Sequence, residues 1–245
     1  MAVAFGHSST GTTAPSGTSL NITHNCTGDN LLVVAVSTRL VTGGCGASDV
    51  TDFAATYNGV SMTYLKGAAG AGDSFVPASD CVYARLLYLV NPASGSNTIA
   101  LTWTSSAYVA AAAISVSGYS SLGTISTSKA SGTTWSSSAT IGANDLIVGS
   151  FHFADSIGNQ NSSDPNWVEA AANSNYISIG MATPSGTGSV AFSGTSTNFG
   201  HIVYALPVLA AASSALKTVD GLAYASVKTV DQLAVASVKS IDDLA

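Results

Sequence analysis

The feature that most constrains this chain is a long series of short apolar or alternating runs, each closed by Gly, Ser, Asn or Pro, over residues 1–209. Runs of this length between turn residues are typical of β-strands. Residues 54–64 form a predicted hairpin, because Asn58-Gly59 accepts the two positive φ angles of a type I′ turn. Residues 31–36 (LLVVAV) are continuously apolar, as in a strand covered on both faces. The pattern predicts an all-β jelly roll or β-sandwich of roughly a dozen strands.

One run could belong to either class of secondary structure. Residues 109–114 contain four alanines, which helices favour. The flanking Tyr108, Val116 and Gly118, in an otherwise β context, favour a strand instead, and alanine in a strand suits close packing between sheets. Further strands are predicted at residues 81–90, 98–104, 108–117, 138–142, 145–153, 176–183, 187–193 and 199–208.

The chain changes character after Leu209. Residues 210–215 are small and predict a hinge, and residues 216–245 contain three near-copies of an eleven-residue unit. A period this regular indicates a repeated structural element. The sequence therefore predicts a β domain at residues 1–209, a hinge, and an assembly or docking tail at residues 216–245.

The spacing of apolar residues in the tail favours a helix, because they recur in steps of 3, 4 and 4, or 3.67 residues per turn. The β alternative places a tight turn at Asp220-Gly221 and stacks the eleven-residue units as a small solenoid. A third alternative is a flexible tail, since Val, Thr and Ser are mediocre helix formers. In either ordered form, the residues expected to mediate assembly are Leu216, Val219, Leu222, Val227, Val230, Leu233, Val238, Ile241 and Leu244.

Charged residues make up only 8% of the chain, and the formal net charge is −6. A surface for nucleic acid or anionic lipid needs clustered Lys and Arg, so neither is expected as a partner. The first residues lack the basic and apolar regions of a signal peptide, which predicts synthesis without one. Cys26, Cys45 and Cys81 favour three buried thiols over one disulfide with a spare thiol.

Residues that could carry chemistry are sparse. The four histidines are scattered without metal-ligand spacing, no GxSxG motif is present, and Glu169 is the only glutamate. We therefore predict no catalytic, cofactor or metal site, and no enzymatic activity. An aromatic platform for stacking against sugar rings is a weaker hypothesis than core packing, and its candidates are Trp103, Trp135 and Trp167.

Four segments of the β domain carry a resemblance: residues 31–36 (LLVVAV), 57–63 (YNGVSMT), 87–101 (LYLVNPASGSNTIAL) and 113–118 (AISVSG). Together they resemble a lectin-like jelly-roll domain of bacteriophage virion proteins and bacterial surface proteins, over residues 30–208. The tail is similar to K-x-[hydrophobic]-[N/D]-G-L-A-x-A-S repeats that end many phage structural proteins. It has Asp in place of the usual Asn and keeps Gly221 only in its first copy. The resemblance implies an architecture and supplies no catalytic residue.

These observations predict a non-enzymatic structural protein of a virion or extracellular filament, such as a capsid decoration, fibre or appendage subunit. Its expected partners are copies of itself, for example in a trimer, and other virion or filament proteins. The alternative is a glycan-binding module or adhesin, which would bind surface glycans on one face of the jelly roll.

Overall fold

The computed structural model divides the chain into two compact units, residues 1–211 (the body) and 212–245 (the second unit), which are described separately. The boundary falls inside the small-residue segment 210–215. The structure describes residues 2–13, 17–40, 50–70, 72–75, 82–131, 134–153, 168–172, 177–182, 188–193 and 200–211 of the body, and residues 218–219, 222–223, 229–230 and 233–234 of the second unit.

Every regular element among the described residues is a β-strand, so the predicted all-β class is confirmed. No helix in the described part of the chain is long and apolar enough to cross a membrane. The sequence analysis missed the segments 4–12, 19–25, 73–75, 119–122, 126–131 and 168–172, so the body has more strands than predicted. They are β1 (Ala4–Thr12), β2 (Ser19–Asn25), β3 (Leu31–Leu40), β4 (Ala54–Tyr57), β5 (Val60–Ser61), β6 (Thr63–Lys66), β7 (Asp73–Phe75), β8 (Val82–Val90), β9 (Ser96–Thr102), β10 (Ala107–Ser117), β11 (Tyr119–Leu122), β12 (Ser126–Ser131), β13 (Thr134–Ala139), β14 (Leu146–Phe153), β15 (Val168–Ala172), β16 (Ile177–Ala182), β17 (Gly188–Ser193) and β18 (Gly200–Ala210).

The body is built around one antiparallel sheet, the central sheet, with strand order β1-β10-β3-β8-β6 and with β7 also paired to β8. Its longest ladder joins β3 to β10, from Leu31↔Val116 to Leu40↔Ala107, without a register shift. The strand β8 pairs with the other side of β3. Strand β3, whose first six residues are all apolar, therefore has hydrogen-bonded neighbours on both sides.

Both faces of the central sheet are covered by protein. Because successive side chains of a strand point to opposite faces, Leu31 and Val33 enter one apolar cluster and Leu32 and Val34 enter another. All four residues are fully buried. No position of residues 31–36 faces water, which explains the uninterrupted apolar run and confirms its interpretation.

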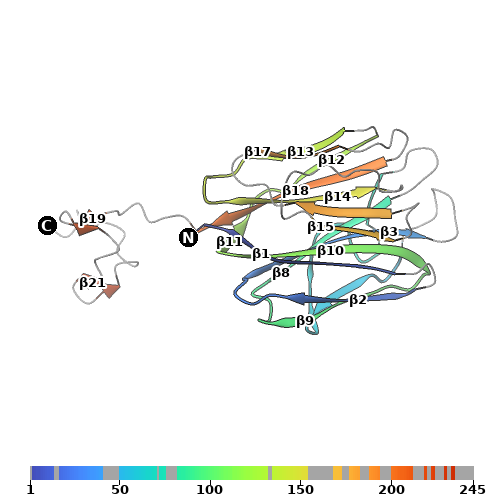
Figure 1. Ribbon diagram of the computed structural model, residues 1–245, viewed down its shortest axis with the longest axis horizontal. Helices are drawn as coiled ribbons and strands as arrows, with labels where there is room; N and C mark the ends of the chain where they lie inside the picture. The colour runs from blue at the N-terminus through green and yellow to red at the C-terminus, as the bar shows by residue number, and fades with distance from the viewer. Residues whose placement is uncertain are drawn as a thin grey trace. The chain divides into compact units, whose positions relative to one another are not determined.

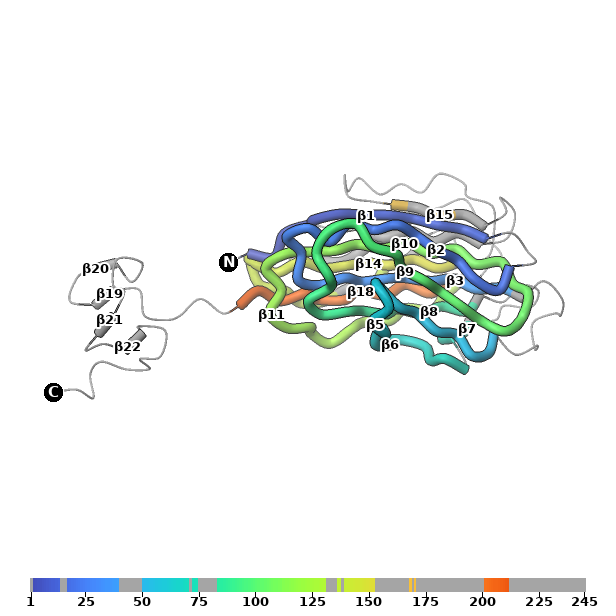
Figure 2. Tube along the Cα trace, turned by 90° about the horizontal axis from the view of Figure 1, so that it is seen from below, coloured from blue at the N-terminus to red at the C-terminus, as the bar shows by residue number. Residues whose placement is uncertain are grey.

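Further sheets complete a stack of layers (Figures 1 and 2). The first flanking sheet, β2-β9-β4-β5, covers one face of the central sheet. The second flanking sheet, β11-β18-β14-β16-β15 with β12 added through β18, covers the other. Beyond it lies the pair β13–β17, with Ala139 of β13 packed against a small cluster that includes Phe151 and Val203 of the second flanking sheet. The body is thus a β-sandwich extended by additional layers.

The predicted hairpin at residues 54–64 is present. Tyr57 pairs with Val60 across the turn, and Asn58 and Gly59 have φ angles of 48° and 78°. Two consecutive positive φ values are the signature of a type I′ turn, which matches the twist of the flanking strands. The Asn-Gly prediction is confirmed.

The alanine run lies in strand β10, as predicted, between the two apolar layers. Ala110 and Ala112 belong to the cluster shared with the second flanking sheet, while Ala111 and Ala113 belong to the cluster shared with the first. All four are fully buried. Small side chains on both faces of one strand let two flanking sheets approach the same backbone closely.

We expect Ala112→Leu to destabilise the body by about 1–3 kcal/mol, because added methyl groups in a packed interlayer force neighbours off their rotamers. Denaturant unfolding of the full chain measures the loss. Ala54→Leu, on an exposed strand position, is the matched control and should change the free energy of unfolding little. Equal effects of the two variants would contradict the close-packing interpretation.

The described residues of the second unit form two small antiparallel pairs. The strands are β19 (Thr218–Val219) with β20 (Leu222–Ala223), and β21 (Thr229–Val230) with β22 (Leu233–Ala234). The helix that the apolar spacing favoured is not present at these described positions, and the turn at Asp220-Gly221 that the β alternative predicts lies outside the described residues. Thr and Val are stiff at χ1 and prefer strands. The second pair forms although Gln232 stands where the first copy has Gly221.

Candidate functional site

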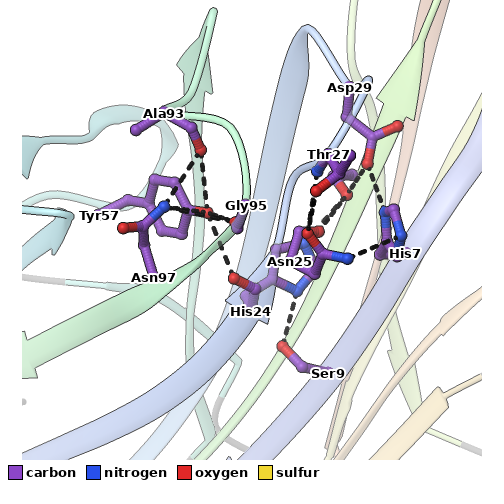
Figure 3. A network of polar contacts seen from close by, with 11 residues as sticks. His7, Ser9, His24, Asn25, Thr27, Asp29, Tyr57, Ala93, Gly95 and Asn97 are labelled. Atoms are coloured by element: carbon purple, nitrogen blue, oxygen red, sulfur yellow. Dashed lines mark hydrogen bonds and ion pairs between the residues drawn. The ribbon is translucent and has the colours of Figure 1, made fainter.

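A network of polar side chains lies between the central sheet and the first flanking sheet, where β1 contacts both β10 and β2 (Figure 3). Its members come from β1, β2, β10 and the turn that joins β2 to β3. Since β1 and β10 belong to one sheet and β2 to another, the network connects two layers. Its residues are His7, Ser9, His24, Asn25, Thr27, Asp29 and Ser115.

Hydrogen-bond directions assign the tautomer of His24. The hydroxyl of Ser115 lies 2.6 Å from Asp29 Oδ2 and donates to this carboxylate. Ser115 Oγ, 3.0 Å from His24 Nε2, therefore accepts the ring proton at that nitrogen. His24 Nδ1 is then an acceptor, and the hydroxyl of Ser9 donates to it at 2.8 Å. The chain of donors runs in one direction from Ser9 to the carboxylate.

A second branch reaches the same carboxylate oxygen. The amide nitrogen of Asn25 donates to His7 Nε2 at 3.1 Å, so His7 carries its proton on Nδ1 and donates to Asp29 Oδ2 at 2.8 Å. The amide oxygen of Asn25 accepts from the backbone N–H and hydroxyl of Thr27, at 3.0 and 2.7 Å. The carboxylate of Asp29 is only 3% exposed, whereas the His7 side chain is 37% exposed.

The network depends on a β-bulge in β1. Phe5 pairs with Val116 and Ser8 with Ile114, so β1 has one extra residue in this stretch. Gly6 lies in the bulge, and a Cβ there would stand 2.0 Å from Asp29 Oδ1. Glycine is therefore required for the carboxylate to approach the strand.

Burial keeps His24 neutral. The residue is 1% exposed, and burial, reinforced by nearby His7 and opposed by Asp29, lowers its pKa from 6.5 to about 4. The buried neighbour Cys26 is a free cysteine, and burial raises the pKa of its thiol. Cys45 and Cys81, the other two cysteines of the sequence, lie outside the described residues.

Tyr57 lies beside the polar network, on the side opposite His7 and Asp29 (Figure 3). Its hydroxyl donates to the carbonyl of Gly95 at 3.0 Å, with those of Ala93 and His24 at 3.2 and 3.3 Å. The amide nitrogen of Asn97 donates to the same hydroxyl at 3.3 Å. Burial raises the pKa of Tyr57 to about 12, so the phenol remains a donor across the ordinary pH range.

A second histidine connects the central sheet to the second flanking sheet. His152 is fully buried, with Nδ1 2.9 Å from the hydroxyl of Ser37 and Nε2 3.0 Å from that of Ser150. Burial lowers its pKa to about 3. Tyr204 packs edge-on against the ring and donates to Asp73 Oδ2 at 2.9 Å. His152 is therefore a buried histidine held by hydrogen bonds to two serine hydroxyls.

Arg85, in the central sheet, is also fully buried. Its guanidinium donates to the carbonyls of Ala68 and Val50 at 3.0 and 3.2 Å and to the hydroxyl of Thr38 at 3.2 Å. It also lies 4.6 Å from the centre of the Phe53 ring. These contacts fix the segments that surround β4, β5 and β6 to strand β8.

The structure separates the residues proposed for sugar stacking. Trp103 is 4% exposed, its ring is stacked with Phe53 at 6.2 Å, and its Nε1 donates to the carbonyl of Gly17 at 3.1 Å. Trp103 therefore packs in the core and offers no open ring face. The backbone of Trp135 pairs with Phe192 in β13–β17. Trp167 lies outside the described residues.

Of the residues proposed for assembly, four are described, as two register pairs: Val219 with Leu222 and Val230 with Leu233. The other five lie outside the described residues: Leu216, Val227, Val238, Ile241 and Leu244. The sequence analysis did not identify the polar network at all. Its members belong to separate segments, and no local spacing reveals the bulge that brings them together.

The contacts of the network hold three strands from two layers in one arrangement and fix the protonation of His24. In the described part of the chain, no three His, Cys, Asp or Glu side chains gather as metal ligands. No protein-family model matches the chain, and no curated protein or solved structure is significantly similar to it.

We expect Gly6→Ala to destabilise the body by about 1–3 kcal/mol, because the added methyl group would overlap the Asp29 carboxylate and displace it. Gly70→Ala is the matched control, since a Cβ at Gly70 meets nothing within 4 Å. Denaturant unfolding measures both. If Gly6→Ala left the free energy of unfolding unchanged, this would show that the network does not stabilise the fold.

Stability should fall as the pH is lowered below about 6.5. His24 and His152 have folded-state pKa values of about 4 and about 3, below the unfolded value of 6.5. The unfolded state therefore binds more protons in this window. Each histidine lowers the free energy of unfolding by about 2–3 kcal/mol between pH 7 and pH 4. Unfolding curves at several pH values test this. His24→Gln and His152→Gln should each flatten the dependence, and an unchanged slope in both would contradict it.

Proposed function

We propose that this protein is a non-enzymatic structural subunit of a virion or an extracellular filament, such as a capsid decoration, fibre or appendage protein. The observation that carries the proposal is the outward face of the first flanking sheet. Along β2 and β9 the side chains alternate between buried and outward positions, and all outward ones are uncharged. They are Ser19, Asn21, Thr23, Ser96, Thr98, Ala100 and Thr102.

The same character extends across the sheet. Thr23 pairs with Thr98, and Asn21 pairs with Ala100, which in turn pairs with Thr56 of β4. Antiparallel sheets that face water normally present charged side chains, which keep proteins from associating. This face instead offers short hydroxyl and amide groups, each able to donate and accept hydrogen bonds. Such a surface can pack against neighbouring subunits without desolvating a charge.

Two further features support a structural role. The body buries its central sheet on both sides, and the chain continues into a second compact unit whose described residues form two strand pairs eleven residues apart. The resemblance to virion and surface proteins points the same way. The glycan-binding alternative loses Trp103 as a stacking ring, which leaves Trp135 and Trp167 as its aromatic candidates.

The test is the location of the natural protein. In cultures that produce it, purified particles or filaments are separated from soluble protein on density gradients and probed with antiserum. We expect the protein in the particle fraction. Its recovery only as free soluble protein would overturn the proposal, and saturable sugar binding by that protein would favour the adhesin alternative.

A charge on the outward face should weaken incorporation. We expect Thr98→Lys and Asn21→Lys to lower the amount of protein in particles at least about ten-fold, because each buries an unpaired ammonium group at the contact. Ser121→Lys, on an exposed position of β11, is the matched control. Equal incorporation of all three variants would show that this face is not the contact.

A further inference from the structure

Strand β2 is an open edge of the first flanking sheet. In the order β2-β9-β4-β5 it has β9 on one side and no described strand on the other. Its further contacts are with β1 and β10, which belong to the central sheet. An open edge presents a row of backbone N–H and C=O groups that can pair with a strand of another chain.

The ladder to β9 decides which backbone groups of β2 are free. The N–H of Cys26 donates to the C=O of Gly95 at 3.1 Å, one register step beyond the end of the ladder. Hydrogen-bonded and non-bonded pairs alternate along an antiparallel ladder, so every second residue before Cys26 also bonds to β9. The residues between them point their N–H and C=O groups to the open edge. They are Ser19, Asn21 and Thr23, the exposed residues of the strand.

This edge lacks the features that usually prevent strands from pairing between chains. β2 is seven residues long, pairs with β9 without a register shift, and contains no proline or charged residue. The other edge strands of the three larger sheets in the described part of the chain each carry such a feature. These are a register shift in β1, β6 and β11, a length of two or three residues in β5 and β7, and a charged residue in β12 and β15.

The free residues of β2 are complementary to themselves. When Asn21 of one copy stands opposite Asn21 of another, Ser19 of each copy stands opposite Thr23 of its neighbour, and each pair can exchange backbone hydrogen bonds. It is the register in which all three residues pair among themselves. Asn25 is not needed for it, and its C=O already accepts from the hydroxyl of Ser115 at 3.3 Å.

Charge favours a second copy of the chain as the partner. Acidic residues outnumber basic ones in the body, so two bodies repel each other wherever their charged surfaces meet. The outward side chains of β2 and of its neighbour β9 are all uncharged. Two copies can therefore meet along β2 without a like-charge contact.

The polar network prepares the edge for this contact. His24 of β2 is hydrogen-bonded to Ser9 of β1 and to Ser115 of β10, which fixes the strand to the central sheet. A strand that is already held in its paired conformation loses little entropy when it binds.

We infer that β2 pairs antiparallel with β2 of a second copy of this chain, so that the two first flanking sheets become one continuous sheet across a two-fold axis. A two-fold contact of this kind uses the same surface of both copies. The inference goes beyond the proposed function, because it assigns an edge of the body and holds whether or not the protein belongs to a particle.

The experiment measures the mass of the full chain by sedimentation and light scattering from micromolar to millimolar concentration. We expect a reversible dimer. Asn21→Lys and Asn21→Asp should each raise the dissociation constant at least about ten-fold, because they place like charges directly opposite each other across the axis. An equimolar mixture of the two variants should dimerise again, since the opposed charges then attract.

Two controls separate the backbone contact from the outward face. Asn21→Ala keeps the N–H and C=O groups of the edge and should remain dimeric. Thr98→Lys charges the outward face on β9, away from the open edge, and should also remain dimeric. The unfolding transition should be the same in all variants, because the changed side chains are exposed.

Three outcomes would overturn the inference: a monomeric parent chain at every concentration, charged variants with the parent's dissociation constant, or a mixture that dimerises no better than each variant alone. The particle experiment gives a separate answer. A dimer that is absent from particles rejects only the structural role, whereas a monomer found in particles rejects only the β2 contact.

Discussion

The need to cover both faces of the central sheet determines the rest of the body. Strands β3 and β10 are apolar on both faces, so a single flanking sheet would leave half of this surface in water. Two flanking sheets bury this apolar surface on both faces, and the alanines of β10 allow both sheets to pack close to the same strand. The outward faces of the outer layers then meet solvent or a neighbouring protein. The character of those outer faces is therefore where function should be sought.

The two interlayers on either side of the central sheet each contain a buried histidine that is hydrogen-bonded to two serine hydroxyls. His24 spans the space toward Ser9 and Ser115, and His152 spans the space between Ser37 and Ser150. A buried imidazole needs a donor on one side and an acceptor on the other, and a serine hydroxyl can act as either. These histidine–serine hydrogen bonds form only when the two sheets are aligned in one register, because in any other register the buried imidazole would lose its partners. They favour a unique alignment of layers over the alternatives that uniform apolar faces would allow.

The sequence was informative about much of the local structure, although it did not predict β1 or β2 as strands. Alternation and turn residues predict most long strands, Asn58-Gly59 predicts its hairpin, and the unbroken apolar run predicts a doubly covered strand. It was uninformative about the polar network, because Ser9, Asp29 and Ser115 meet through a bulge and a ladder register that depend on the whole sheet. The second unit shows a different failure. An eleven-residue period fits three helical turns and also fits a hairpin with its connection, and periodicity alone does not separate them; the β-branched Thr218 and Val219 carried the better signal.

The body and the second unit differ in how the conformational entropy lost on folding can be offset. The body orders many residues but buries several layers of apolar surface, so its fold is supported from within. The second unit orders a chain with the same entropy cost per residue, yet its hairpins have two-residue strands and its sequence offers no cross-link. The apolar layers that support the fold of the body therefore do not account for the second unit.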